Sequence, residues 1–129
     1  MTHYLQNEHF AATLTRLAPV WQAATGNNLL AEFLEVERPA TFDPRTADWT
    51  RWADAVRPIA QAMMGEAVGI ECAYSAERGA ALGLIARVVQ QAERVCDPGP
   101  AWIAAAIYDL EWAERRLRWA WNDNSPLKP

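Results

Sequence analysis

Apolar residues recur along most of this chain every three or four positions, which is the spacing of helices that bury one face. The pattern is clearest in residues 3–24, 47–64 and 76–95. A shorter apolar segment, 29–37, ends before Pro39, because the residue preceding a proline avoids helical dihedral angles. Together with a last helix at 100–121, these segments predict an all-α bundle of five or six helices.

Prolines and glycines interrupt several of these patterns. Pro19 and Pro58 each lie inside an apolar stripe, so we expect two of the helices to be kinked or broken there. Gly26 is placed to cap the first helix, and Gly65 to end the helix that begins at Ala47. Residues 66–74 alternate like a strand, but no other segment offers a strand partner, so we predict a helix.

The stretch 100–121 has two apolar faces rather than one. At about 100° per residue, one stripe has the ordinary spacing of a core face: Ile103, Ile107, Leu110, Leu117 and Trp121. On nearly the opposite side lie three aromatic residues with two arginines beside them: Tyr108, Trp112, Trp119, Arg115 and Arg116. Either this second face packs within the chain, or it is a contact surface for a partner. Trp, Tyr and Arg dominate protein-binding hot spots, so we predict partner binding at these five residues.

Glu114 falls inside the core stripe of the same helix, between Leu110 and Leu117. A buried carboxylate needs a partner, or its pKa rises. Three interpretations follow: the side chain pairs with Arg118 at the edge of the stripe, it is a buried polar anchor to another helix, or it belongs to a site.

Composition and charge narrow the class of protein. The chain has 129 residues, of which 51% are hydrophobic and 22% charged, which indicates a single globular domain. We expect this helical domain to span residues 1–121 and a flexible tail to follow at 122–129. The net charge is −4 and no basic arm is present, which makes nucleic-acid binding unlikely on electrostatic grounds. No signal peptide and no 18-residue apolar stretch is evident, so we expect a cytoplasmic protein without a membrane span.

Catalytic signatures are missing from the sequence. It has no GxSxG or SxxK motif and no phosphate-binding glycine loop. His3 lies near the terminus, where we expect it to be mobile, and His9 lies beside the first stripe, where we expect an exposed or satisfied side chain. Cys72 and Cys96 lack metal-binding spacing, and we expect both to be buried, reduced thiols. We therefore predict no cofactor and no metal.

Two Glu-x-x-Glu pairs keep an enzyme open as an alternative. Glu32 with Glu35, and Glu111 with Glu114, each share a helix face. Carboxylates are the ligands that Mg²⁺ prefers, so a helical enzyme or a small-ligand or Mg²⁺-binding protein is the second hypothesis.

Our leading prediction is a small, acidic, non-enzymatic protein-binding module of bacterial or phage type. Such a protein would act as an inhibitor, immunity protein or adaptor by occluding a partner protein with its aromatic and arginine face. A third hypothesis is a homodimer in which the same face meets a second copy of the chain.

Overall fold

A computed structural model describes residues 3–122 of the chain, and the side chains as far as Arg118. The described part is an all-α bundle of five helices without strands. A 3₁₀ turn, η1, precedes the helices, and the elements are η1 (Tyr4–Gln6), α1 (Glu8–Thr25), α2 (Leu29–Glu35), α3 (Ala47–Ala73), α4 (Ala76–Arg94) and α5 (Pro100–Asn122). The tail predicted beyond α5 lies outside the described residues.

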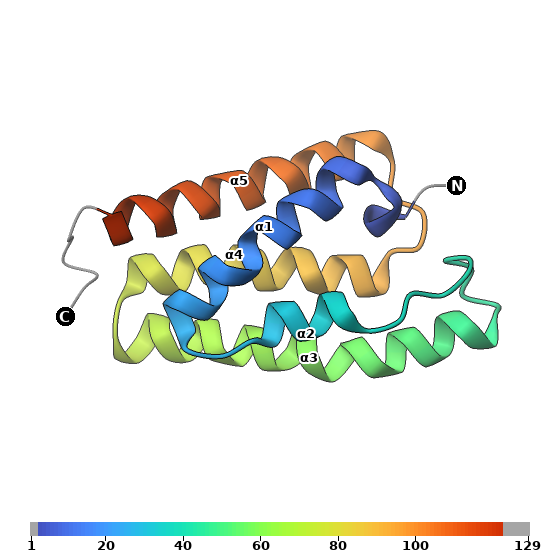
Figure 1. Ribbon diagram of the computed structural model, residues 1–129, viewed down its shortest axis with the longest axis horizontal. Helices are drawn as coiled ribbons and strands as arrows, with labels where there is room; N and C mark the ends of the chain where they lie inside the picture. Colours follow the sequence, from blue (N-terminus) through green and yellow to red (C-terminus); the bar gives the residue numbers. More distant parts are fainter. Residues whose placement is uncertain (1–2, 123–129) are drawn as a thin grey trace.

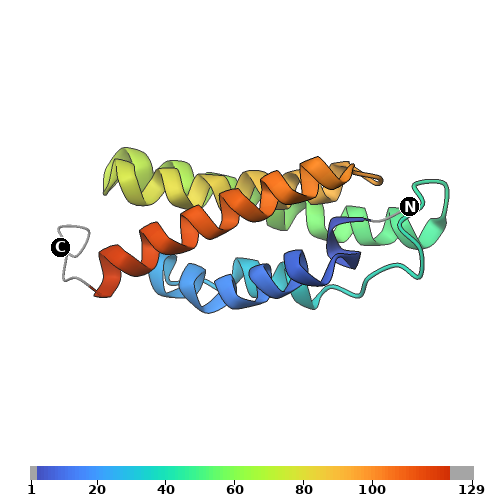
Figure 2. The ribbon, with the colours of Figure 1, turned by 90° about the horizontal axis from the view of Figure 1, so that it is seen from above.

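The five helices form a closed ring of neighbours. Consecutive helices pack against each other from α1 to α5, and α5 returns to pack against α1. Figure 1 shows α3, α4 and α5 running along the long axis of the molecule, with α1 crossing them obliquely. In Figure 2, α1 and α2 lie on one side of α3 and α4. Among the described helices, none covers the opposite side of α4.

The predicted stripes form the core. In the apolar pattern of residues 3–24, the residues spaced three or four positions apart are buried: Phe10, Leu14, Leu17, Trp21 and Ala24. On α5, Ile103, Leu110 and Leu117 are buried and Ile107 is half-buried. The periodicity therefore identified the correct faces of these two helices.

Neither internal proline breaks its helix. α1 continues past Pro19 to Thr25, and α3 continues past Pro58 to Ala73. Both prolines are exposed, and so are Thr15 and Asp54, the residues four positions earlier. Proline has no backbone N–H, so the carbonyl oxygens of Thr15 and Asp54 lack their usual helical donor. Because both residues face solvent, water can bond to these carbonyls instead.

The predicted end of the third helix at Gly65 is wrong. α3 runs on through Gly65 and Gly69 to Ala73, and Tyr74 is its C-cap. The segment 66–74 is therefore helical, as predicted, up to Ala73 and is continuous with α3. A Cβ at Gly79 of α4 would overlap the backbone of Glu71 of α3. The lack of a side chain at Gly79 lets α3 and α4 approach closely. The packing of α3 on α4 outweighs the low helix propensity of Gly65 and Gly69 in α3.

One helix start and one helix end also differ from the predictions. α1 begins at Glu8 rather than at residue 2 or 3, because Asn7 follows η1 and caps α1 by accepting from the Phe10 backbone N–H at 3.0 Å. α2 ends at Glu35 rather than Glu37. Gly26 has the expected left-handed conformation at the end of α1, with φ 83°.

His3 is not mobile, contrary to the expectation from its place near the terminus. Its side chain is buried and stacks on Phe42, with ring centroids 3.8 Å apart. Nε2 lies 2.6 Å from the carbonyl oxygen of Ala92, which connects the N-terminus to the end of α4. These contacts join residues far apart in the chain, so local sequence gave no sign of them.

The cysteines also depart from expectation. Cys72 is exposed and Cys96 is half-buried, and both are free thiols. Cys72 lies at the end of α3, where residues 71–74 are all exposed. In the same described part of the chain, no helix is long and apolar enough to cross a membrane.

Candidate protein-binding surface

The outer face of α5 carries aromatic side chains. α5 buries its core stripe against α1 and α4, which turns Tyr108 outward with 63% of its surface exposed. Trp112, one turn further, is half-buried and packs against the edge of the core. Arg115 and Arg116 are both exposed. Trp119 was predicted for the same face, but its side chain lies outside the described part.

Trp112 is held in place by Arg116. The guanidinium carbon lies 4.5 Å from the centroid of the indole ring, within the range of a cation–π contact. Arg116 Nη1 also donates to Glu77 Oε1 of α4 at 3.1 Å. Both partners of this ion pair are about half exposed, so its contribution to stability is at most about 1 kcal/mol. The contact orients the ring rather than stabilising the fold strongly.

An apolar hollow of about 340 Å³ lies beside Trp112 on the uncovered side of α4. Its apolar wall includes Met64 and Val68 of α3 and Leu84 of α4, and Val68 is 51% exposed. The hollow stays open beside Gly83, where an added Cβ would meet no atom within 4 Å. We did not predict this hollow from the sequence, because ending the third helix at residue 64 left Val68 without an assigned face.

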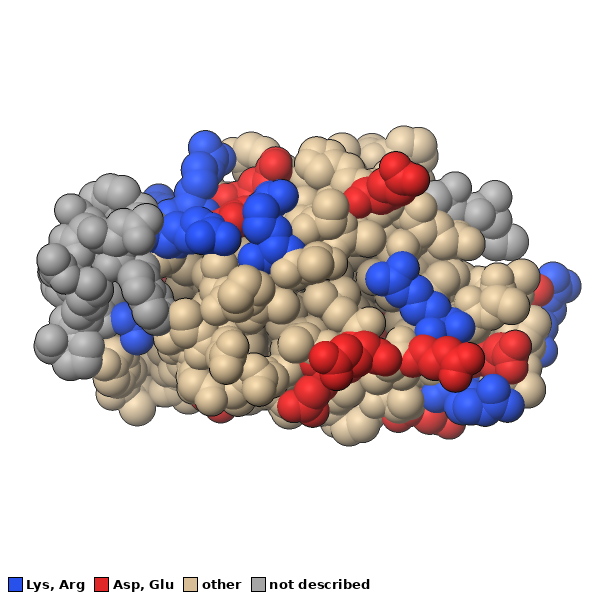
Figure 3. Space-filling view, in the orientation of Figure 1, with Lys and Arg blue, Asp and Glu red and all other residues tan. Residues whose placement is uncertain are grey.

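A second hollow, of about 800 Å³, lies on the other side of Trp112 and is lined by charged residues: Glu114, Arg115, Arg116 and Arg118. Figure 3 shows basic side chains gathered at the upper left, toward the C-terminal end of α5, while acidic side chains dominate the lower edge. The protein carries a net charge of −4, so this basic region is a local reversal of the overall charge.

Glu114 connects α5 to α1. It is 8% exposed, and Arg16 Nε of α1 donates to its two carboxylate oxygens at 3.0 and 3.1 Å. Arg118 Nε donates to Oε2 at 2.8 Å. Burial alone raises the pKa of Glu114, but the hydrogen bonds from Arg16 and Arg118 outweigh it and hold that pKa below its usual value. Glu114 thus pairs with Arg118 and also joins two helices.

A similar buried carboxylate, Glu93 of α4, was not singled out in the sequence. It is 3% exposed and accepts from Arg57 Nε of α3 at 3.0 Å. Glu93 lies among apolar residues of α4, just as Glu114 does in α5. The sequence could therefore have predicted a buried ion pair at Glu93, because a carboxylate inside a core stripe requires a partner.

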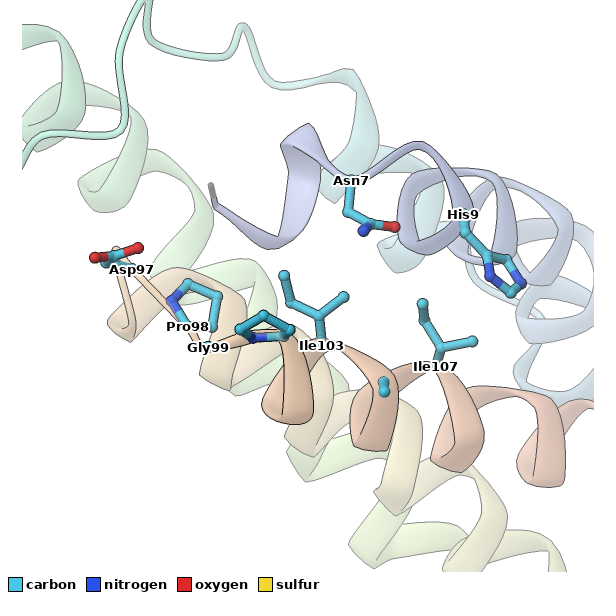
Figure 4. A pocket seen from close by; sticks show the side chains of 9 residues that line it. Asn7, His9, Asp97, Pro98, Gly99, Ile103 and Ile107 are labelled. Atoms are coloured by element: carbon cyan, nitrogen blue, oxygen red, sulfur yellow. The ribbon is translucent and has the colours of Figure 1, made fainter. Parts of the chain in front are cut away.

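Another hollow lies next to His9, between the start of α1 and the start of α5. It measures about 640 Å³, and Figure 4 shows Ile103 and Ile107 on one side with Asn7 and His9 on the other. His9 Nε2 lies 3.7 Å from Glu111 Oε2, and the His9 side chain is 62% exposed. Among the described residues, its lining holds no Ser, Thr or Cys side chain, so these residues offer no nucleophile of those types for His9 to activate.

The two glutamate pairs are not brought together as a metal site. Glu32 and Glu35 are exposed on α2, whereas Glu114 is engaged by two arginines on the α1–α5 side. Among the residues that the structure describes, no group of three or more His, Cys, Asp or Glu side chains is arranged to hold a metal ion.

Comparison with known proteins supplies no relative: no family model, no curated protein and no solved structure matches this chain. The surface around Trp112 is therefore interpreted from its chemistry alone. It combines an oriented indole, an exposed tyrosine, an apolar hollow and a basic hollow.

Proposed function

We propose that this protein is a non-enzymatic protein-binding module that acts as an inhibitor, immunity protein or adaptor by covering part of a partner protein. One observation carries the proposal. Trp112 is held by Arg116 at the boundary between an apolar hollow and a basic hollow, with the exposed Tyr108 one turn away. We name the surface formed by Tyr108, Trp112, Arg115 and Arg116 with the apolar hollow the Trp112 surface.

The physical chemistry of this surface favours binding to a protein. Hot spots are enriched in Trp, Tyr and Arg placed in pockets that exclude water on binding. Aromatic side chains also lose little conformational entropy on binding, because they have only two rotatable side-chain bonds. Trp112 is already oriented by Arg116, so part of the entropic cost of binding is met before a partner arrives.

The enzyme hypothesis finds less support in the geometry. The four glutamates that would hold Mg²⁺ lie on different sides of the bundle, and Glu114 is neutralised by Arg16 and Arg118. The homodimer hypothesis concerns the same surface and is decided by the same variants.

The proposal is tested by capturing partners on the purified protein from an extract of its source cells. Mass spectrometry identifies the retained proteins, and each candidate is then purified and titrated against the wild-type protein. We expect Tyr108→Ala to weaken such a complex by about 2 kcal/mol, or roughly thirtyfold in Kd. Trp102→Ala is the matched control, because Trp102 is also exposed on α5, at 57%, but lies outside the Trp112 surface.

The outcomes are distinct. A purified binary complex that is weakened by Tyr108→Ala and not by Trp102→Ala supports the proposal. If no complex depends on Tyr108, or if light scattering shows a dimer that Tyr108→Ala dissociates, binding to a different protein through this surface is refuted.

A further inference from the structure

The two hollows beside Trp112 differ in chemistry, and together they specify a partner more narrowly than a binding surface alone. On the α3–α4 side the lining is mostly apolar, with Met64, Val68 and Leu84 among its residues. On the other side the described lining consists of Trp112, Glu114 and three arginines. A ligand that fills both must place an apolar group and an anionic group a short distance apart.

The arginines on this surface are unequally engaged. Arg118 bonds to Glu114, and Arg116 shares its charge with Glu77. The side chains of Arg115, in the basic hollow, and Arg87, at the apolar hollow, make no ion pair or hydrogen bond with a described residue. Two guanidinium groups are thus available near Trp112, and Glu71 is the acidic residue that lines the apolar hollow.

We propose that the partner presents an acidic peptide segment to the Trp112 surface. An apolar side chain of that segment enters the hollow between α3 and α4, and flanking carboxylates bind Arg115 and Arg116, with Arg87 at the opposite rim. The inference rests on the proposed function, since it names the partner of the same surface.

Charge and geometry favour carboxylates here. The planar guanidinium binds carboxylates with two parallel hydrogen bonds, which gives direction as well as attraction. The net charge of −4 repels an acidic partner at long range, but a local basic hollow orients it at contact, within about a Debye length. A nucleic acid needs a longer row of phosphate contacts than these few arginines provide.

The test uses a phage-displayed library of random peptides selected against the immobilised wild-type protein. We expect enriched sequences to carry Asp or Glu beside a large apolar residue. Synthetic copies should lose at least about tenfold in affinity for the Arg115→Glu/Arg116→Glu variant, and should bind less tightly as salt is raised. Arg45→Glu/Arg51→Glu is the matched control, since it changes the net charge equally at two exposed arginines away from both hollows.

The result also separates this inference from the proposed function. Enriched peptides that require Tyr108 but show no acidic preference, or that bind the Arg115→Glu/Arg116→Glu variant equally well, overturn the acidic segment and leave the protein-binding surface standing. Failure to enrich any peptide overturns the acidic segment too, and the capture experiment above then decides the proposed function separately. Saturable binding of a single-stranded oligonucleotide through Arg115 assigns the basic hollow to phosphate and also refutes the inference.

Discussion

Acidification should destabilise this fold through His3. In the folded protein His3 Nε2 lies 2.6 Å from the Ala92 carbonyl oxygen, and Nδ1 accepts from the Leu5 backbone N–H at 3.1 Å. Both ring nitrogens are thus used by one neutral tautomer, and a proton on Nδ1 would face the Leu5 N–H. Burial lowers the pKa of His3 from 6.5 to about 4; the bond to Ala92 opposes this shift and nearby Arg38 adds to it.

The sign and size of the effect follow from proton linkage. Between pH 6.5 and pH 4 the unfolded chain holds the His3 proton and the folded protein does not, so the free energy of unfolding falls as the pH falls. The loss is about 2 kcal/mol between pH 7 and pH 5, and approaches about 3 kcal/mol at pH values below the folded pKa.

Urea denaturation at pH 7 and pH 5 measures this change. Carboxylates also titrate in acid, so the informative quantity is the difference between the wild-type protein and His3→Gln. We expect this variant to be less stable at pH 7 but to lose about 2 kcal/mol less than the wild type on acidification. His9→Gln is the control, because His9 is exposed, and it should keep the His3-dependent loss. Equal losses in the wild type and His3→Gln, or an NMR titration of the His3 ring near pH 6.5, would show that the reasoning is wrong.

Three further predictions concern single side chains. Glu114→Gln removes the charge that two arginines neutralise and should lower the free energy of unfolding by about 1–3 kcal/mol in urea at pH 7; an unchanged midpoint would contradict the role of this contact. Gly79→Ala should destabilise the protein, because the added Cβ would overlap the backbone of α3. Gly83→Ala has open space around the added Cβ and should stabilise the protein by about 0.5–1 kcal/mol. Melting temperatures that shift in the same direction for both variants would refute this assignment. Cys72 should react with a thiol reagent before Cys96, whose pKa is raised by burial, and Cys72→Ser should remove the fast phase of the reaction.

Much of the fold was predictable because its signals are local. Apolar residues three and four positions apart share a helix face, so the stripe from Phe10 to Ala24 and that from Ile103 to Leu117 identified the buried sides of α1 and α5. The caps of α3 and α4, Thr46 and Ser75, are local in the same way, since each bonds to the backbone three residues further on.

The sequence predicted the residues that α5 contributes to the candidate site, but not their partners on other helices. The spacing of Tyr108, Trp112 and Arg116 placed them on one side of α5, and Glu114 was singled out because a carboxylate in a core stripe requires a partner. The partner itself, Arg16, lies 98 positions away, and no local pattern encodes that distance.

The sequence by itself determined which segments are helical, which faces are apolar and that one carboxylate needed neutralising. Tertiary structure decided the rest: that α3 continues past Gly65 along α4, that His3 is buried against Ala92, and that α3 and α4 form an apolar hollow beside Trp112. The physical reason is the range of the interactions. Helix periodicity and capping act within a few residues, whereas burial, close helix approach and ion pairing depend on residues that only the folded chain brings together.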